Sequence, residues 1–334
     1  MLQVGSVTLK SPVFLATMSG VSDFPFRSMV TSFGDGNVVS EMIASESMIR
    51  QTRQSLLMAK PLTSSNATNI TQIAGVKPKV MAEAAKLAVD MGAAIVDINM
   101  GCPAKKVVGQ AAGSALMKDL RHARQILSQV VKAVSVPVTL KMRKGWDDET
   151  QNAPELAYIA QEEGVQMITV HGRTRCQFYR GDSDWAFFER VRQKISIPFV
   201  GNGDIKTPQT ALSLMKQYNL NGVMIGRACY GRPWRIAQVH HFLRTQKLLP
   251  EPSVAQQKEI VLTHLGHLLD FYGKEVGVRI ARKHLGWYSK GYASGATFRA
   301  QVNQTEKESD LLRSTALFYD TQAAFPENET ACTG

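Results

Sequence analysis

Eight short apolar runs, rich in β-branched residues, alternate with stretches of helical periodicity along most of the sequence. Runs that are apolar throughout are typical of parallel strands buried on both faces, and the helical stretches would supply the crossovers. Eight such units predict an α/β fold with a closed (β/α)8 TIM barrel, with a doubly wound open sheet as the alternative. The predicted strands are 13–17, 38–42, 69–74, 95–99, 137–141, 167–171, 197–201 and 222–226.

The pattern changes after Arg244, where strand-like runs cease. A proline-marked connection covers 247–253, and the stretch that follows has the periodicity of amphipathic helices. We therefore expect a barrel in residues 1–245, a small all-helical domain in 253–325 and a flexible tail in 326–334.

Charge and cysteine content narrow the class of protein. The net charge of +11 favours polyanionic partners such as nucleic acid. On charge alone, a basic excess that only aids solubility explains the composition about equally well. The four cysteines are far apart and form no CxxC pair, which argues against a disulfide framework and a metal site. No secretory signal and no membrane span is visible, so we expect a cytoplasmic protein.

Polar residues gather where the predicted strands end. Barrel enzymes carry their chemistry at the carboxyl ends of the strands, so this placement predicts a site there. Each residue alone has an ordinary structural explanation, but Lys141 would be costly in a barrel mouth without an anionic or electron-rich partner. The residues at or near strand ends include Met18, Asp23, Glu41, Gln72, Asn99, Cys102, Lys141, Arg143, His171, Arg173, Asn202, Asp204 and Arg227.

Glycines mark the loops after the seventh and eighth predicted strands, at 201–205 and 226–228. Barrels commonly bind a phosphate here, with backbone N–H groups and a cation facing it. The alternative is that these glycines serve only as turn residues with positive φ.

Cys102 is a candidate for chemistry, because it follows a strand between Gly101 and Pro103 and precedes a polar loop. A lone cysteine is most often a small buried hydrophobe, and Cys176 and Cys229 are interpreted in that way. His171 ends a strand and can donate a hydrogen bond to a ligand ring.

Five segments together closely resemble the bacterial tRNA-dihydrouridine synthases, and the B subfamily in particular. The resemblance covers essentially the whole barrel and reappears in the helical region. It is carried by residues 97–106 (DINMGCPAKK), 140–146 (LKMRKGW), 171–175 (HGRTR), 224–228 (MIGRA) and 279–284 (RIARKH).

The resemblance implies a flavin mononucleotide (FMN) at the barrel mouth and NADPH as the reductant. By resemblance, Met18 and Ser19 line the isoalloxazine site, and Gln72, Lys141 and His171 contact the flavin ring or its tail. The residues expected around the ribityl phosphate are Asn202, Gly203, Asp204, Gly226 and Arg227.

The implied reaction reduces the C5–C6 bond of uridine in tRNA, expected to be a D-loop uridine, because an unstacked loop base is cheaper to reach. Flavin N5 would deliver hydride to C6, and Cys102 would protonate C5. Asn99 and Arg143 are candidates for orienting the uracil. Basic residues expected to contact tRNA include Arg173, Arg279, Arg282 and Lys283, and we expect a monomer.

Two other functions compete with this prediction. One is a flavin barrel acting on a free pyrimidine, and the other is a non-catalytic RNA-binding barrel. The sequence also departs from the family: Thr17 stands where proline is usual, which affects the rigidity of the first flavin-contacting turn, and Gly201 stands where alanine is commoner, which we expect to be harmless.

Overall fold

The computed structural model describes residues 1–63 and 67–324. Its contacts divide the chain into two compact units, which we call the barrel unit and the helical unit. The barrel unit comprises Met1–Cys229 and Trp234–Leu248, and the helical unit comprises Tyr230–Pro233 and Leu249–Gly334. No pattern in the sequence indicates that Tyr230–Pro233 groups with the helices. The predicted tail, 326–334, lies outside the described residues.

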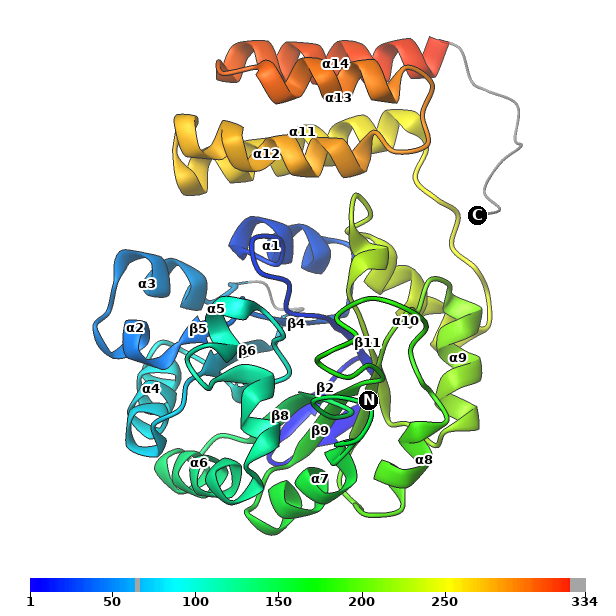
Figure 1. Cartoon of the computed structure of the whole chain (residues 1–334). Helices are drawn as coiled ribbons and strands as arrows, with labels where there is room; N and C mark the ends of the chain where they lie inside the picture. Colours follow the sequence, from blue (N-terminus) through cyan, green and yellow to red (C-terminus); the bar gives the residue numbers. More distant parts are fainter. Residues whose placement is uncertain (64–66, 325–334) are drawn as a thin grey trace. The chain divides into compact units, whose positions relative to one another are not determined.

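Eight parallel strands form the closed ring of the barrel unit (Figure 1). Pairing of β4 with β6, through Val38 and Asn69, closes the ring, and the short β5 (Ile43–Ala44) extends beside β6. The predicted (β/α)8 barrel is confirmed, and each predicted strand coincides with a real one to within a few residues. The strands are β3 (Val13–Leu15), β4 (Asn37–Val39), β6 (Asn69–Ala74), β7 (Ile95–Met100), β8 (Val138–Arg143), β9 (Met167–His171), β10 (Phe199–Asn202) and β11 (Gly222–Ile225).

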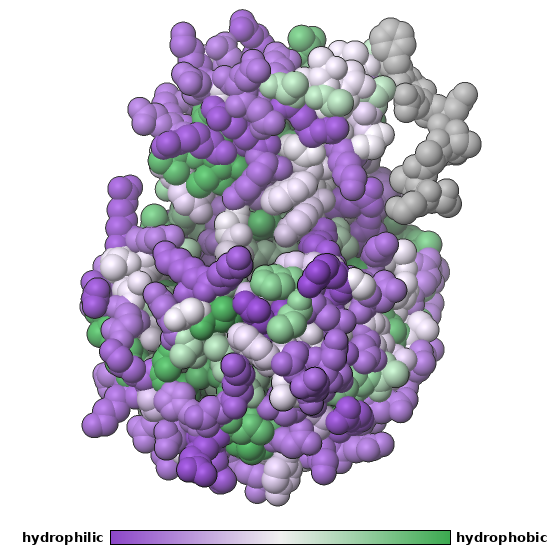
Figure 2. All heavy atoms as spheres, viewed as in Figure 1, coloured by the Kyte–Doolittle hydropathy of each residue, from purple (hydrophilic) through white to green (hydrophobic). Residues whose placement is uncertain are grey.

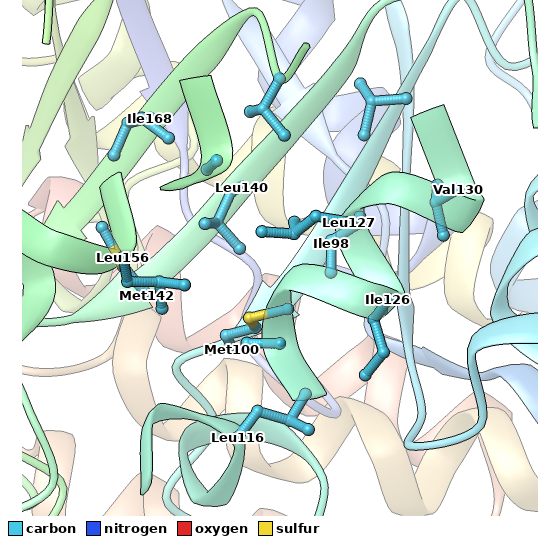
Figure 3. Packing of buried hydrophobic residues seen from close by; sticks show 14 of the residues in the cluster. Ile98, Met100, Leu116, Ile126, Leu127, Val130, Leu140, Met142, Leu156 and Ile168 are labelled. Carbon is cyan, nitrogen blue, oxygen red and sulfur yellow. The ribbon is translucent and has the colours of Figure 1, made fainter. Parts of the chain in front are cut away.

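Helices surround the ring, as the right-handed β/α crossovers require (Figure 1). They bury one apolar side against the outer face of the strands. In Figure 3, Ile98, Leu140 and Ile168 of three neighbouring strands lie with side chains of α6 and α7 in one cluster. The helices are α1 (Phe24–Ser32), α2 (Ser45–Ile49), α3 (Arg53–Ala59), α4 (Pro78–Asp90), α5 (Lys105–Val108), η1 (Gly113–Lys118), α6 (Leu120–Ala133), α7 (Ala153–Glu162), α8 (Phe187–Arg192), α9 (Pro208–Gln217), η2 (Arg227–Cys229) and α10 (Arg235–Thr245).

An antiparallel hairpin of β1 (Leu2–Val4) and β2 (Val7–Leu9) closes one end of the barrel. Its apolar side chains join Phe14, Ile70 and Ile95 in the interior cluster, near the amino ends of the strands. The hairpin was not predicted. It leaves the carboxyl ends of the strands as the end where a ligand can enter.

In the described part of the helical unit there are four helices, α11 (Val254–Tyr272), α12 (Lys274–Tyr288), α13 (Gly295–Gln304) and α14 (Glu308–Ala324). Ser253 and Gln256 form a reciprocal capping box that fixes the start of α11. The all-helical character predicted for this region is confirmed. Among the described residues, every helix is too short or too polar to cross a lipid bilayer. Hydrophilic side chains cover most of the face shown in Figure 2.

Candidate active site

Side chains on the barrel strands alternate between the helices and the interior, because successive residues of a strand point to opposite faces. Ile98 and Met100 lie in the outer apolar cluster, so Asp97 and Asn99 on the same strand point inward. The register pairs Asn99 with Lys141, and Arg143 with His171. These predicted side chains therefore meet at the carboxyl ends of adjacent strands.

Lys141 is the partly buried cation at the centre of this group. Its ammonium donates to Asn202 Oδ1 at 3.2 Å, and Asn202 Nδ2 donates to the Met224 carbonyl at 2.8 Å. Burial lowers the pKa of Lys141 to about 8, and the Arg143 charge lowers it as well, while Asp97 partly offsets both. An ammonium with three donors has further donors to offer a ligand.

His171 is buried beside several cations. Burial is the main reason that its pKa lies well below the ordinary value, and the charges of Arg143 and Lys141 lower it further. The imidazole is therefore neutral at physiological pH, with one ring nitrogen able to donate and the other able to accept.

The turn that carries Cys102 is held from both sides. Asn99 Oδ1 accepts from the backbone N–H groups of Gly101 at 3.1 Å and Cys102 at 2.9 Å. On the other side, Ser114 donates through its N–H and its hydroxyl to the Cys102 carbonyl, and Arg143 Nε donates to the Gly101 carbonyl at 3.0 Å. The thiol is partly exposed and lies on the same barrel mouth as Lys141.

Asp204 organises the loops after β9, β10 and β11. Its carboxylate accepts from Arg173 at 2.5 Å and from Arg227 at 2.8 Å. Burial alone would raise the pKa of Asp204, but the Arg173 hydrogen bond and the two positive charges hold it below its ordinary value. The carboxylate therefore fixes two guanidinium groups, and a direct contact of Asp204 with a phosphate stays a prediction.

Arg173 is buried more deeply than the sequence suggests, at 2% exposure. Besides Asp204, its guanidinium donates to the carbonyls of Arg180 and Gly181. It braces the loop that follows β9, and its predicted contact with tRNA is untested by the structure.

Gly203 has a local reason to be glycine. Its φ is +146°, and an added Cβ would lie 2.0 Å from Ser183 Oγ. The packing of Ser183 thus requires a glycine here whether or not a phosphate binds. Gly226 is different, because an added Cβ would meet Ala16 and Met18 at 3.5 Å, an ordinary contact distance. Met18 and Gly226 accordingly lie close together, and their contacts with the flavin ring and the ribityl phosphate stay predictions.

The remaining predicted residues are divided between the two units. Gln72 is fully buried in the barrel, with its amide bonded to Asp97 and Asn99, and Ser19 is exposed after β3. On α12 of the helical unit, Arg279 is exposed, and Arg282 donates to the Thr305 carbonyl at 2.8 Å beyond the end of α13. Lys283 is partly exposed on the same helix.

Tyr179 was missed by the sequence analysis. The residue is 55% exposed, and its ring lies 4.8 Å from the Arg227 guanidinium and 5.6 Å from that of Arg143. The ring centroid lies 6.3 Å from that of His171. The sequence offers one weak signal, two aromatic residues between Arg175 and Arg180 in a loop after a strand. An exposed aromatic ring at this place can stack on a flat ligand.

No group of three or more His, Cys, Asp or Glu side chains that could hold a metal ion occurs within residues 1–63 and 67–324. The barrel mouth instead combines cations, a neutral histidine and a thiol. Fold and site together define a β/α-barrel enzyme whose barrel mouth suits an anionic or electron-rich ligand.

The chain belongs to the dihydrouridine synthase (Dus) family, whose profile matches residues 14–324. A probable tRNA-dihydrouridine synthase of Rickettsia bellii is 51% identical, over 91% of this chain and 93% of its own. The tRNA-dihydrouridine synthase B proteins of Xanthomonas campestris and Pseudomonas aeruginosa are 46% and 42% identical, and each alignment covers at least 95% of both chains. This family of oxidoreductases is flavin-dependent. The predicted resemblance, including its B-type character, is confirmed.

Among solved structures, a mutant of FabK from Thermotoga maritima is similar with a TM-score of 0.42 and 12% identity, covering 67% of this chain and 64% of its own. This likeness is too weak to add to the family assignment.

Proposed function

We propose that the protein reduces the C5–C6 double bond of a uridine in tRNA, with bound FMN as the redox cofactor and NADPH as the electron source. The observation that carries the proposal is the common location of Cys102, Lys141 and His171 at one barrel mouth. The family membership and the names of the relatives support it.

The residues at the mouth fit FMN by their donor chemistry. Lys141 and Arg227 supply positive charge, the Asn202 amide lies beside Lys141, and neutral His171 can donate to a ring heteroatom. Asp204 neutralises part of this charge, but the described cations near the mouth outnumber it. An anionic phosphate and an electron-rich ring both suit such a cationic barrel mouth.

Bound FMN would supply hydride for uracil C6, and NADPH would restore its two electrons. The protein's part is to hold the base and deliver a proton. The Cys102 S–H bond breaks as its proton passes to C5, and the thiolate then recovers a proton from solvent. Arg143 Nη2 makes no hydrogen bond to a described residue, so it is available to a uracil carbonyl. Tyr179 offers a stacking surface for the base.

We propose that the target uridine lies in the D loop. We also propose that the reaction takes place in the cytoplasm, where tRNA is processed, and that the protein acts as a monomer. A base in a loop costs less to unstack than one in a stem.

The test uses unmodified tRNA transcript, FMN and NADPH, with dihydrouridine located by mass spectrometry. We expect reduction at one position and NADPH oxidation that depends on tRNA. Free uracil and orotate are the comparison substrates. Faster turnover of either free base would assign the protein to pyrimidine metabolism, and tRNA binding without NADPH oxidation would indicate a non-catalytic barrel.

A further inference from the structure

A continuous chain of hydrogen bonds crosses the barrel interior below the Cys102 turn. It begins at Asp97, which is 3% exposed on β7. The two carboxylate oxygens accept from Thr139 Oγ1 and from Gln72 Nε2, both at 2.6 Å. Gln72 is itself fully buried, so solvent has no access to either partner.

The carboxylate fixes the direction of the whole chain. An ionised carboxylate can only accept, so the Gln72 amide must turn its nitrogen toward Asp97. Gln72 Oε1 therefore faces Asn99 and accepts from Asn99 Nδ2 at 2.8 Å. This leaves Asn99 Oδ1 to accept from the backbone N–H groups of Gly101 and Cys102.

Both ends of the chain are chemically unambiguous, because a backbone N–H can only donate. One orientation of the two amides satisfies both ends, and it is the one observed. If either amide turned over, two donors would face each other in a buried site, which costs roughly 1–3 kcal/mol. The position of the Cys102 N–H is thus tied to a carboxylate two side chains away.

A carboxylate at position 97 is unfavourable for the stability of the fold. Burial raises the pKa of Asp97 to about 6, although the Thr139 and Gln72 hydrogen bonds and the Lys141 charge all oppose the rise. In some proteins such a buried ionic group is retained because it specifies one arrangement of its neighbours.

We propose that Asp97 is a positioning residue that sets the place of the Cys102 thiol through the amides of Gln72 and Asn99. The inference deepens the proposed function, because it matters for catalysis only if Cys102 is the proton donor. Asp97 is buried, and both of its carboxylate oxygens are bonded to protein side chains, so it acts through the two amides. Its effect on the turn is present in the protein without the base or the flavin.

The test compares Asp97→Leu, which removes the acceptor, with Asp97→Asn. Asparagine can keep the chain, since its Oδ1 can accept from Gln72 while its amino group faces the Thr139 hydroxyl. Thr169→Val is the matched control, because the Thr169 hydroxyl is buried in the same barrel and has no hydrogen-bond partner. Asp97→Ala, which adds no volume, replaces the leucine variant if that one does not fold.

The first readout is alkylation of Cys102 by iodoacetamide, followed on its own peptide by mass spectrometry. The second is kcat and KM for tRNA, with flavin content and melting temperature measured alongside. In Asp97→Leu we expect Cys102 to be alkylated several-fold faster, and kcat to fall roughly 10–100-fold with KM little changed, the range typical when a positioning interaction is removed. Asp97→Asn and Thr169→Val should stay close to wild type in both readouts.

Wild-type alkylation and kcat in a folded Asp97→Leu variant would overturn the proposal. Equal changes in alkylation rate and kcat in Asp97→Asn and Asp97→Leu would overturn it as well. The charge of Asp97, and not the direction of the hydrogen-bond chain, would then be what matters. If wild-type protein fails to reduce tRNA, the proposed function fails, and the alkylation rates still decide whether Asp97 positions the turn.

Discussion

At the scale of single residues, the Cys102 thiol sits on a turn braced by Asn99 and Ser114. If it is the proton donor, Cys102→Ala should leave flavin reduction by NADPH unchanged and reduce uridine reduction by about 100-fold or more. Stopped-flow absorbance near 450 nm reports the first step, and dihydrouridine yield reports the second. Cys176→Ala is the control and should retain both. Full uridine reduction by Cys102→Ala would remove the assigned role.

Lys141 gives the site a characteristic pH dependence. Its pKa is lowered to about 8, chiefly by burial, so its positive charge is present below pH 8 and is lost as the pH rises through that value. Negative charge that develops on the flavin during reduction loses its partner in the same range. We expect the rate of flavin reduction by NADPH to fall above pH 8.

Two variants isolate this effect. Lys141→Arg keeps a charge throughout, so its rate, although lower, should not fall between pH 7 and 9.5. Lys141→Met should be slow and equally flat. A fall of wild-type size in the methionine variant would assign the pH dependence to another group.

Asp97 predicts a pH dependence of stability, in a lower pH range than that of Lys141. Its pKa is raised from 3.8 to about 6, so between these values the folded protein binds more protons than the unfolded chain. The contribution of Asp97 to stability therefore declines as the pH rises through this window. Asp97→Asn should gain stability relative to wild type between pH 4 and pH 7.5 in urea denaturation. A constant difference between the two proteins at both pH values would contradict the raised pKa.

At the scale of elements, β10 carries Gly201 where alanine is commoner in the family. Neighbouring side chains occupy the space that the alanine methyl group would need. An added Cβ at Gly201 would lie 2.6 Å from Trp185 Cζ3 and 2.7 Å from Leu220 Cδ1. Gly201→Ala should therefore destabilise the barrel by about 1–3 kcal/mol, the usual cost of overpacking. Urea denaturation measures the loss. In Gly226→Ala the new methyl group has room, so a similar loss there would show that crowding is not the cause.

The strands were predictable because each is a short apolar run buried on both faces, as β7 and β9 illustrate. The β1–β2 hairpin was not, since two strands of three residues are too short to give a periodic signal. The strand ends indicated where Lys141 and His171 would meet. They could not indicate the pairing of Asp204 with Arg173 or the exposure of Tyr179, because these depend on contacts between loops.

At the scale of the whole molecule, the net charge of +11 belongs to the barrel unit, because the sequence of the helical unit carries ten Lys and Arg against ten Asp and Glu. What matters for binding is therefore where individual cations lie and whether they are paired. Cations at the barrel mouth are held by specific partners, such as Asp204 for Arg227. On α12, by contrast, Arg279 is exposed at the surface of the helical unit. Exposed cations of this kind bind phosphates by releasing counterions, which makes their contribution dependent on salt and independent of base sequence.

Replacing Arg279 and Lys283 by alanine should therefore weaken tRNA binding and lower the slope of log K against log salt by roughly 1–2, about 0.7–0.9 for each phosphate that is no longer neutralised. Filter binding across a salt series measures this slope. Lys79→Ala with Lys86→Ala is the control, because it removes the same charge from the exposed side of α4 on the barrel unit. Equal slopes in the two double variants would mean that only net charge matters. A smaller slope in the α12 variant alone, with unchanged flavin content, would identify that helix as a tRNA-binding surface.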